Sequence, residues 1–93
     1  MEIFGRNTLA DFKAKHQDAS SQIDAWVAEV GVARWDKPPD IKARYVSASF
    51  LSDRHVVFNI KGNKYRLLVQ VSYKNQVVFV KKAGTHQEYM KWR

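Results

Sequence analysis

The sequence of 93 residues contains no cysteine and has a second half that is almost without acidic residues. The absence of cysteine excludes disulfides, thiolate nucleophiles and zinc–thiolate sites. The longest apolar runs are about four residues, against the ~20 needed to cross a bilayer, and no basic stretch followed by an apolar run opens the chain. We therefore expect a single soluble domain over residues 1–93, located in the cytoplasm and without a membrane partner.

Positive charge is concentrated in the second half of the chain. Residues 1–53 hold seven Lys/Arg and eight Asp/Glu, whereas residues 54–93 hold nine Lys/Arg and only Glu88, which together give the net charge of +7. A basic half of this density is typical of a protein that binds an anionic partner, and nucleic acid is the first candidate. The alternative is a solvated surface that serves solubility alone.

The basic half predicts an antiparallel β-meander. Runs rich in β-branched and aromatic residues cover 55–60, 65–73 and 76–83, with turns at 61–64 and 74–75. In the middle run Tyr65, Leu67, Val69, Val71 and Tyr73 alternate with Arg66, Leu68, Gln70 and Ser72, which predicts one buried and one partly polar face. Gly62 and Asn63 both tolerate positive φ, and this pair favours a two-residue hairpin loop.

The first half predicts two helices. Asn7 or Thr8 can cap the first, and Leu9, Phe12 and His16 recur along it at helical spacing, with His16 as a packed or capping residue. The second starts at Asp18 or Ser20 and carries the apolar face Ile23, Trp26, Val27 and Val30.

Shorter segments flank these helices and strands. Pro39 favours a short helix through Arg44, and residues 87–93 predict a terminal turn or nascent helix. Residues 1–4 form either an edge strand or a segment under a helix, and the pattern leaves both open. The element order predicts an α+β fold, with two N-terminal helices packed on an antiparallel meander of three to four strands.

Metal-dependent chemistry is not indicated by the sequence. His16, His55 and His86 are far apart, and no two of them share a metal-binding spacing, while the carboxylates are concentrated in the helical half. We therefore expect no metal site and no cofactor.

The candidate functional residues are the side chains of the basic half that carry positive charge or can transfer a proton. Arg66 lies in mid-strand beside apolar neighbours, so it needs an anionic partner, either a carboxylate of this chain or an external phosphate. Lys81 shares its strand face with Val77 and Phe79, and the alternative for it is a lysine that extends past apolar residues into solvent.

This set of residue types suits RNA cleavage without a metal ion. Attack by a ribose 2′-hydroxyl on the adjacent phosphate requires a base, positive charge and an acid. Arginine binds phosphate oxygens with two parallel hydrogen bonds, which suits Arg66 to the charge role. A histidine titrates near neutrality, which suits His86 to proton transfer, and Tyr89 can stack on a base or donate a proton.

Three parts of the sequence resemble the HigB-type toxins of bacterial type II toxin–antitoxin pairs. The stretches are Val57-Phe58-Asn59-Ile60-Lys61-Gly62-Asn63-Lys64-Tyr65-Arg66-Leu67, Gln76-Val77-Val78-Phe79-Val80-Lys81 and Gly84-Thr85-His86-Gln87-Glu88-Tyr89. The first and last of these stretches are specific to the family when they occur together, and the similarity covers nearly the whole chain.

The resemblance implies a RelE-like fold and an mRNA-cleaving toxin that acts on messages bound to the ribosome. It also implies a small antitoxin encoded beside it, either acidic or of helix-turn-helix type. Arg66 matches the family's hairpin arginine, Lys81 its basic residue on the last strand, and His86 and Tyr89 its C-terminal histidine and tyrosine. We expect these four to be catalytic, with Arg66 and Lys81 on the scissile phosphate and His86 with Tyr89 in proton transfer and base stacking. Lys61, Lys64, Lys74 and Lys82 are then expected to attract the RNA backbone.

A non-enzymatic function remains the alternative. Relatives of the same fold inhibit DNA gyrase, and an RNA-binding module that uses the face of the sheet is a further possibility.

Overall fold

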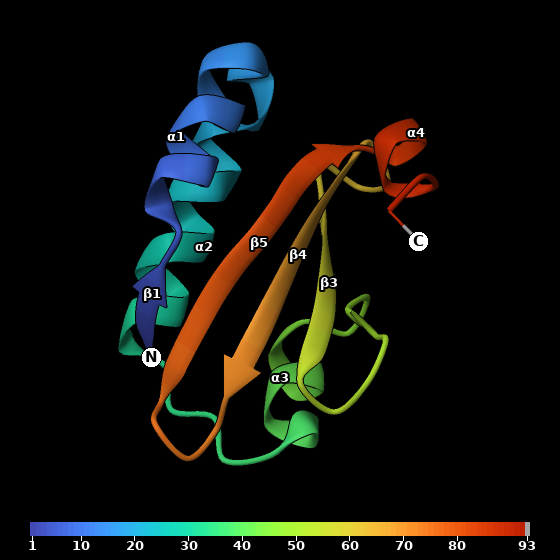
Figure 1. Ribbon diagram of the computed structural model, residues 1–93. Helices are drawn as coiled ribbons and strands as arrows, with labels where there is room; N and C mark the ends of the chain where they lie inside the picture. The colour runs from blue at the N-terminus through green and yellow to red at the C-terminus, as the bar shows by residue number, and fades with distance from the viewer. Residues whose placement is uncertain (93) are drawn as a thin grey trace.

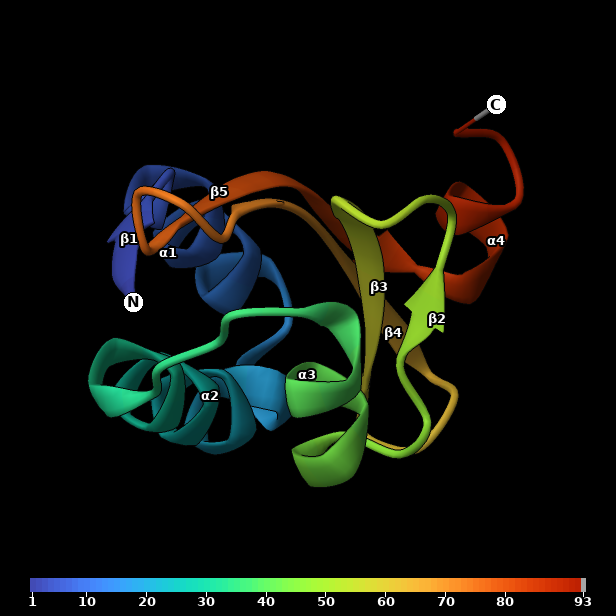
Figure 2. The ribbon, with the colours of Figure 1, turned by 90° about the horizontal axis from the view of Figure 1, so that it is seen from below.

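The computed structural model describes residues 1–92, which fold into one mixed sheet with helices around it (Figure 1). In chain order the elements are β1 (Glu2–Phe4), α1 (Arg6–Lys15), a 3₁₀ turn η1 (Gln17–Ala19), α2 (Ser20–Val32), α3 (Pro38–Arg44), β2 (Ser49–Phe50), β3 (His55–Ile60), β4 (Tyr65–Ser72), β5 (Val77–Thr85) and α4 (His86–Tyr89). The strand order is β1-β5-β4-β3-β2. Figure 2 shows α2 and α4 on opposite sides of the sheet.

The α+β class and the three predicted meander strands are confirmed as β3, β4 and β5. The predicted sheet of three to four antiparallel strands is wrong, because the sheet has five strands and β1 runs parallel to β5. β1 pairs Phe4 with Phe79, so residues 2–4 form an edge strand, and β2 adds two residues beyond β3. A strand of three residues is too short for its alternation to identify it, and only its pairing with β5 defines it.

The turn between β3 and β4 is confirmed at 61–64, but its loop is longer than the two residues predicted. Ile60 pairs with Tyr65, which leaves four residues in the loop, and the positive φ angles fall on Lys61 and Gly62. The predicted two-residue loop at Gly62 and Asn63 is therefore wrong. The backbone N–H of Lys61 donates to Gln22 Oε1 of α2 at 2.7 Å, so contact with a helix holds this loop open.

β4 divides the sheet into a covered face and an open face. Tyr65, Leu67, Val69 and Val71 are buried in the core, whereas Arg66, Leu68, Gln70 and Ser72 are only half-buried, which confirms the predicted alternation. We call the face opposite α1 and α2 the open face; it carries Phe4 of β1, Phe79 and Lys82 of β5, and Arg66, Leu68 and Gln70 of β4. The core beneath the other face includes the edge-to-face pair of Trp26 and Phe58, with ring centroids 5.5 Å apart.

A bulge interrupts the pairing of β5 with β4. Leu68 lies opposite Lys82 and Val69 lies opposite Val80, so Lys81 is the extra residue. Such a bulge shifts the alternation of a strand and re-aims its side chains. Lys81 and Lys82 are consequently both exposed.

The start of α1 differs from the prediction, because Asn7 and Thr8 lie inside its first turn and do not cap it. The helix follows Gly5, whose φ of 87° lies in the left-handed region. A Cβ at this position would lie 2.5 Å from the Val80 carbonyl oxygen. Glycine thus allows the chain to leave β1 against β5 and enter a helix at once.

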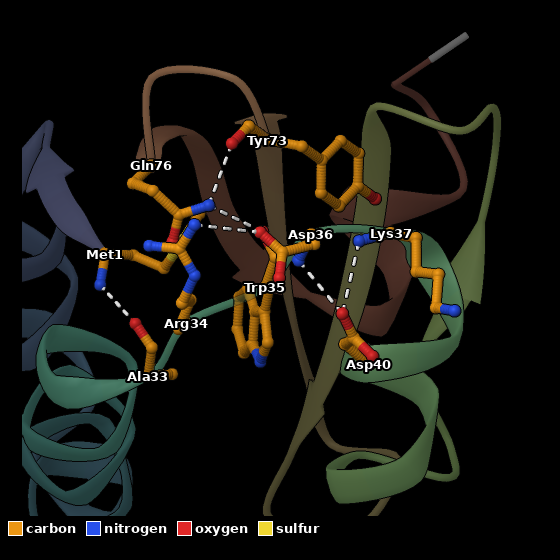
Figure 3. Close-up of polar contacts among 9 residues, drawn as sticks. All are labelled: Met1, Ala33, Arg34, Trp35, Asp36, Lys37, Asp40, Tyr73 and Gln76. Atoms are coloured by element: carbon orange, nitrogen blue, oxygen red, sulfur yellow. Dashed lines mark hydrogen bonds and ion pairs between the residues drawn. The ribbon is translucent and has the colours of Figure 1, made fainter.

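The segment between α2 and α3 is anchored by side chains on both sides (Figure 3). Gln76 Nε2 donates to the Trp35 carbonyl oxygen at 2.8 Å, and Asp40 Oδ2 accepts from the Asp36 backbone N–H at 2.9 Å. The predicted short helix is confirmed as α3, which begins at Pro38. At the other end of the chain, the predicted turn over 87–93 is present as α4 and the turn through Trp92, while Arg93 lies outside the described residues.

Candidate active site on the open face of the sheet

Arg66 is the second residue of β4, so it lies at the end of the open face next to the 61–64 loop, and its predicted place in mid-strand is wrong. It lies between Asn59 of β3 and Gly84 of β5. Its Nη1 donates to the Asn63 carbonyl oxygen at 2.9 Å, and its guanidinium carbon lies 5.5 Å from the centre of the Tyr89 ring. Over residues 1–92 no carboxylate lies within 4.0 Å of it, so the structural ion pair considered from the sequence finds no partner there. The guanidinium is oriented by a carbonyl and a ring, and it keeps donors for an anionic ligand.

The C-terminal segment folds over the open face beside Arg66. Thr85 Oγ1 accepts from the Glu88 N–H at 3.2 Å and Glu88 Oε1 accepts from the Thr85 N–H at 2.8 Å, a capping box that starts α4. The hydrogen bond from the Thr85 backbone lowers the pKa of Glu88. A Cβ on Gly84 would lie 3.0 Å from both Glu88 and Trp92, so the glycine lets this segment approach the sheet.

α4 brings His86 and Tyr89 together, and Tyr89 links them to Arg66. The rings of His86 and Tyr89 lie 6.4 Å apart, and the His86 backbone N–H donates to the Lys64 carbonyl oxygen at 3.1 Å. Tyr89 in turn packs edge-to-face on Trp92 at 5.7 Å. Three of the four predicted catalytic residues thus lie together.

The two lysines of the bulge extend in different directions over the open face. Lys82 Nζ lies 5.7 Å from the Trp92 ring, on the side of Tyr89 and Arg66. Lys81 Nζ lies 5.6 Å from the Phe79 ring, towards the β1 edge. The sequence assigned Lys81 to the scissile phosphate and Lys82 to general attraction, whereas the structure places Lys82 closer to the Arg66 group.

The remaining predicted RNA-binding lysines lie at the two ends of the sheet. Lys61 and Lys64 belong to the loop that precedes β4, next to α4, and Lys74 belongs to the turn between β4 and β5 at the opposite end. Lys64 Nζ is 2.8 Å from Asp18 Oδ2, so one lysine of this set already has an acidic partner.

Asp18 joins η1 to the start of β4. It accepts hydrogen bonds from Lys64 Nζ and, at 2.7 Å, from the Tyr65 hydroxyl, and these two donors lower the pKa of Asp18 from 3.8 to about 2. His16 packs with its ring 4.8 Å from both Phe12 and Tyr65, so the prediction of a packed histidine is confirmed.

Two aromatic residues of the open face were not among the predicted site residues. Phe4 and Phe79 stack at the β1 edge with ring centroids 5.5 Å apart. The sequence placed Phe79 on the same strand face as Lys81, which was a signal for this residue. Its partner Phe4 could be identified only from the pairing of β1 with β5.

Groups of three His, Asp or Glu side chains able to hold a metal ion do not occur among residues 1–92. Over the same residues, every helix is too short or too polar to span a membrane. Two hollows, of about 290 and 460 Å³, flank α3 and have none of Arg66, His86 and Tyr89 in their linings. A third hollow, of about 450 Å³, is lined by His86 together with Lys64 and Tyr65.

Fold and site together describe a small α+β protein that presents cations and aromatic rings on one face of its sheet. Residues 19–92 match the HigB toxin family, the RelE-like toxic component of a toxin–antitoxin system, and the chain belongs to this family. It is similar to the mRNA interferase toxin HigB of Escherichia coli strain K12 and to the mRNA interferase HigB proteins of Escherichia coli O157:H7 and Shigella flexneri. Each is 26% identical over 91 residues, which cover 96% of this chain and 88% of the relative.

Proposed function

We propose that this protein is the toxin of a toxin–antitoxin pair and that it cleaves mRNA as a metal-independent endoribonuclease. The observation that carries the proposal is the environment of Arg66, which lies on the open face against Tyr89 with no carboxylate within 4.0 Å among the residues described. A guanidinium in that position suits a phosphate group, and three relatives are named mRNA interferases.

In this mechanism the 2′-hydroxyl of the nucleotide before the cut attacks the adjacent phosphorus, and the 5′-oxygen of the next nucleotide leaves. The products carry a 2′,3′-cyclic phosphate and a 5′-hydroxyl. Arg66 binds the non-bridging oxygens, where negative charge increases in the transition state. Lys82 supplies the second positive charge, since it lies on the side of Trp92 and Tyr89, and Lys81 contacts a phosphate further along the strand.

In this proposal His86 and Tyr89 carry out proton transfer. His86 and Tyr89 are the groups near Arg66 that can take the proton from the 2′-hydroxyl and give one to the leaving oxygen. Tyr89 also offers a ring on which a base can stack, while Arg66 holds the other side of the ring.

The partners of the proposal are mRNA and a cognate antitoxin. The family to which the chain belongs is the toxic half of a two-component system, so a neutralising protein is implied. We propose that it is small and encoded beside the toxin, either acidic or of helix-turn-helix type, and that the toxin acts in the cytoplasm on messages bound to the ribosome.

The test is cleavage of a defined message, free and bound to ribosomes, with the ends of the products identified. We expect 2′,3′-cyclic or 3′-phosphate ends and loss of the cut when the nucleotide before it is 2′-deoxy. Cleavage should persist in excess chelator, on ribosomes kept intact by other means or on any free RNA that the protein cuts. Products with 3′-hydroxyl ends would overturn the mechanism. Growth arrest without cleavage of either form of RNA would instead favour a non-enzymatic inhibitor.

A further inference from the structure

Phe4 and Phe79 form an exposed aromatic pair at the β1 edge of the open face. Their side chains are 47% and 38% exposed, and their rings are stacked 5.5 Å apart with planes 19° from parallel. Burial of large aromatic rings is a main source of stability, and here two of them are left in solvent side by side.

The pair is held by the backbone on both strands. β1 runs parallel to β5 and places Phe4 directly opposite Phe79. The preceding pair, Ile3 and Val78, faces the core. Beyond Phe4, the close approach of Gly5 to the Val80 carbonyl oxygen ties the end of β1 to β5. The strand pairing thus places the two rings side by side on the open face.

Cations lie on one side of this pair. Lys81 Nζ is 5.6 Å from the Phe79 ring, and the bulge turns both Lys81 and Lys82 towards the open face. The neighbour of Phe79 on β4 is Gln70, an amide that can donate or accept a hydrogen bond. The carboxylate of Glu2 lies two residues from Phe4, opposite Val77, on the side away from Lys81.

We propose that Phe4 and Phe79 are a second base-stacking platform for single-stranded RNA, with Lys81 as its phosphate contact. The platform rests on the proposed function and extends it. The RNA strand passes from Tyr89 and Arg66, past Lys82 and Lys81, to the aromatic pair, and Glu2 marks the end of the path by repelling phosphate. Stacking platforms interleaved with cations are how proteins hold single strands without reading sequence.

Charge disfavours a second copy of this chain as the occupant of this surface. A second copy of this chain would bring a net charge of +7 to Lys81 and Lys82, which disfavours self-association there. An anionic strand with flat bases satisfies both the lysines and the rings.

The experiment measures the affinity of fluorescein-labelled 2′-O-methyl RNA, which cannot be cleaved because its 2′-hydroxyls are blocked. Two lengths are used, about four and about twelve nucleotides, which span the usual range of single-strand sites. The variants are Phe4→Leu, Phe79→Leu and Lys81→Gln, and leucine keeps the apolar volume without the flat ring. Matched controls are Val32→Ala, an exposed apolar residue of α2, and Lys37→Gln, an exposed lysine before α3.

We expect each phenylalanine variant to bind the longer RNA about tenfold more weakly, since the stacking of one base is worth roughly 5- to 150-fold in affinity, with the shorter RNA and the control variants unchanged. A 2-aminopurine base in the longer RNA should lose the quenching that stacking causes in the same variants. Equal affinities for wild type and both phenylalanine variants would overturn the platform. So would a wild-type dimer in sedimentation that these variants dissociate, because the rings would then be a protein interface.

The proposal of a stacking platform and the proposal of a nuclease can be refuted independently. Cleavage of unmodified RNA by the same variants reports the active site around Arg66. Normal cleavage with unchanged binding would refute the platform alone, and weakened binding with a wild type that cleaves no RNA would refute the nuclease alone.

Discussion

At the scale of single residues, the neighbours Arg66 and Leu67 show how one strand divides function from stability. Leu67 is fully buried in the core, whereas Arg66 is half-buried on the open face and contacts a carbonyl and the Tyr89 ring. Adjacent positions of β4 are therefore expected to respond in opposite ways to the same truncation.

Arg66→Ala should leave the melting temperature nearly unchanged and lower RNA cleavage by one to several orders of magnitude, roughly 2–4 kcal/mol of transition-state stabilisation. Leu67→Ala should cost about 2–5 kcal/mol of stability as a core truncation. Arg66→Lys should restore only part of the activity, because a point charge replaces a planar fork. Thermal unfolding beside a cleavage assay checks all three, and a strongly destabilised Arg66→Ala protein would mean that the arginine is structural.

His86 and Tyr89 can be separated by their chemistry. His86→Ala should lower cleavage about 10²–10⁴-fold while the affinity for 2′-O-methyl RNA stays the same, because loss of proton transfer affects the reaction and not binding. Tyr89→Phe keeps the ring against Arg66 and should keep that affinity, whereas Tyr89→Ala should lose it. Cleavage at the wild-type rate by His86→Ala would remove this residue from the mechanism.

At the scale of elements, two connections attach the helices to the sheet. One is the tight turn between β1 and α1, and the other is the set of hydrogen bonds between η1 and the start of β4. Gly5 allows the first connection and Asp18 makes the second. Neither residue belongs to the proposed site, and each gives a test of the fold that does not depend on function.

Gly5→Ala should destabilise the protein by about 1–3 kcal/mol, because the residue has φ of 87° and a methyl group would meet the Val80 carbonyl oxygen. Gly31→Ala is the matched control, since Gly31 lies in α2 with nothing within 4 Å of an added Cβ. It should stabilise the protein by about 0.5–1 kcal/mol through helix propensity. Urea unfolding measures both, and equal effects of the two substitutions would contradict the strained connection.

Asp18 should make stability depend on pH in the acid range. Its pKa falls from 3.8 to about 2 on folding, so its contribution is fully present above pH 3.8 and disappears as the pH falls towards 2. Asp18→Asn should therefore lower the melting temperature at pH 6, and the difference from wild type should shrink between pH 4 and pH 2. Asp11→Asn, at an exposed position of α1, is the control, and a difference independent of pH would show that the contacts of Asp18 with Lys64 and Tyr65 are not responsible.

At the scale of the whole molecule, the difference in charge between the two halves of the chain coincides with the difference in structure between helices and strands. The helical half is nearly neutral, and the strands carry the excess positive charge together with an open face. An electrostatic contribution that does not depend on sequence should therefore dominate RNA binding.

Binding of 2′-O-methyl RNA should weaken steeply with salt, and the slope of log K against log salt should become shallower by about 0.7 for each phosphate contact removed. We expect this change for Arg66→Ala and for Lys82→Gln, and none for Lys37→Gln. Fluorescence titrations at several salt concentrations measure it. Parallel lines for all variants would show that these side chains do not contact phosphate.

Much of this organisation follows from local patterns that the sequence carries by itself. The alternation along 65–72 decides which side of β4 faces the core, because successive side chains of a strand point to opposite faces whatever else surrounds it. The helical spacing of apolar residues predicted α2, the proline at position 39 predicted α3, and runs of β-branched and aromatic residues predicted the three long strands. The tandem motifs around Arg66 and His86 also sufficed to indicate the HigB family.

Tertiary structure alone decided which residues meet across strands. Three residues of β1 have no periodicity to recognise, so the stacking of Phe4 on Phe79 exists only through the parallel pairing with β5. The bulge at Lys81 is a mismatch of register between two strands, and neither strand shows it alone. For that reason the sequence could name the cations of the site, and only the fold could place Lys82 against Trp92 and Lys81 against Phe79.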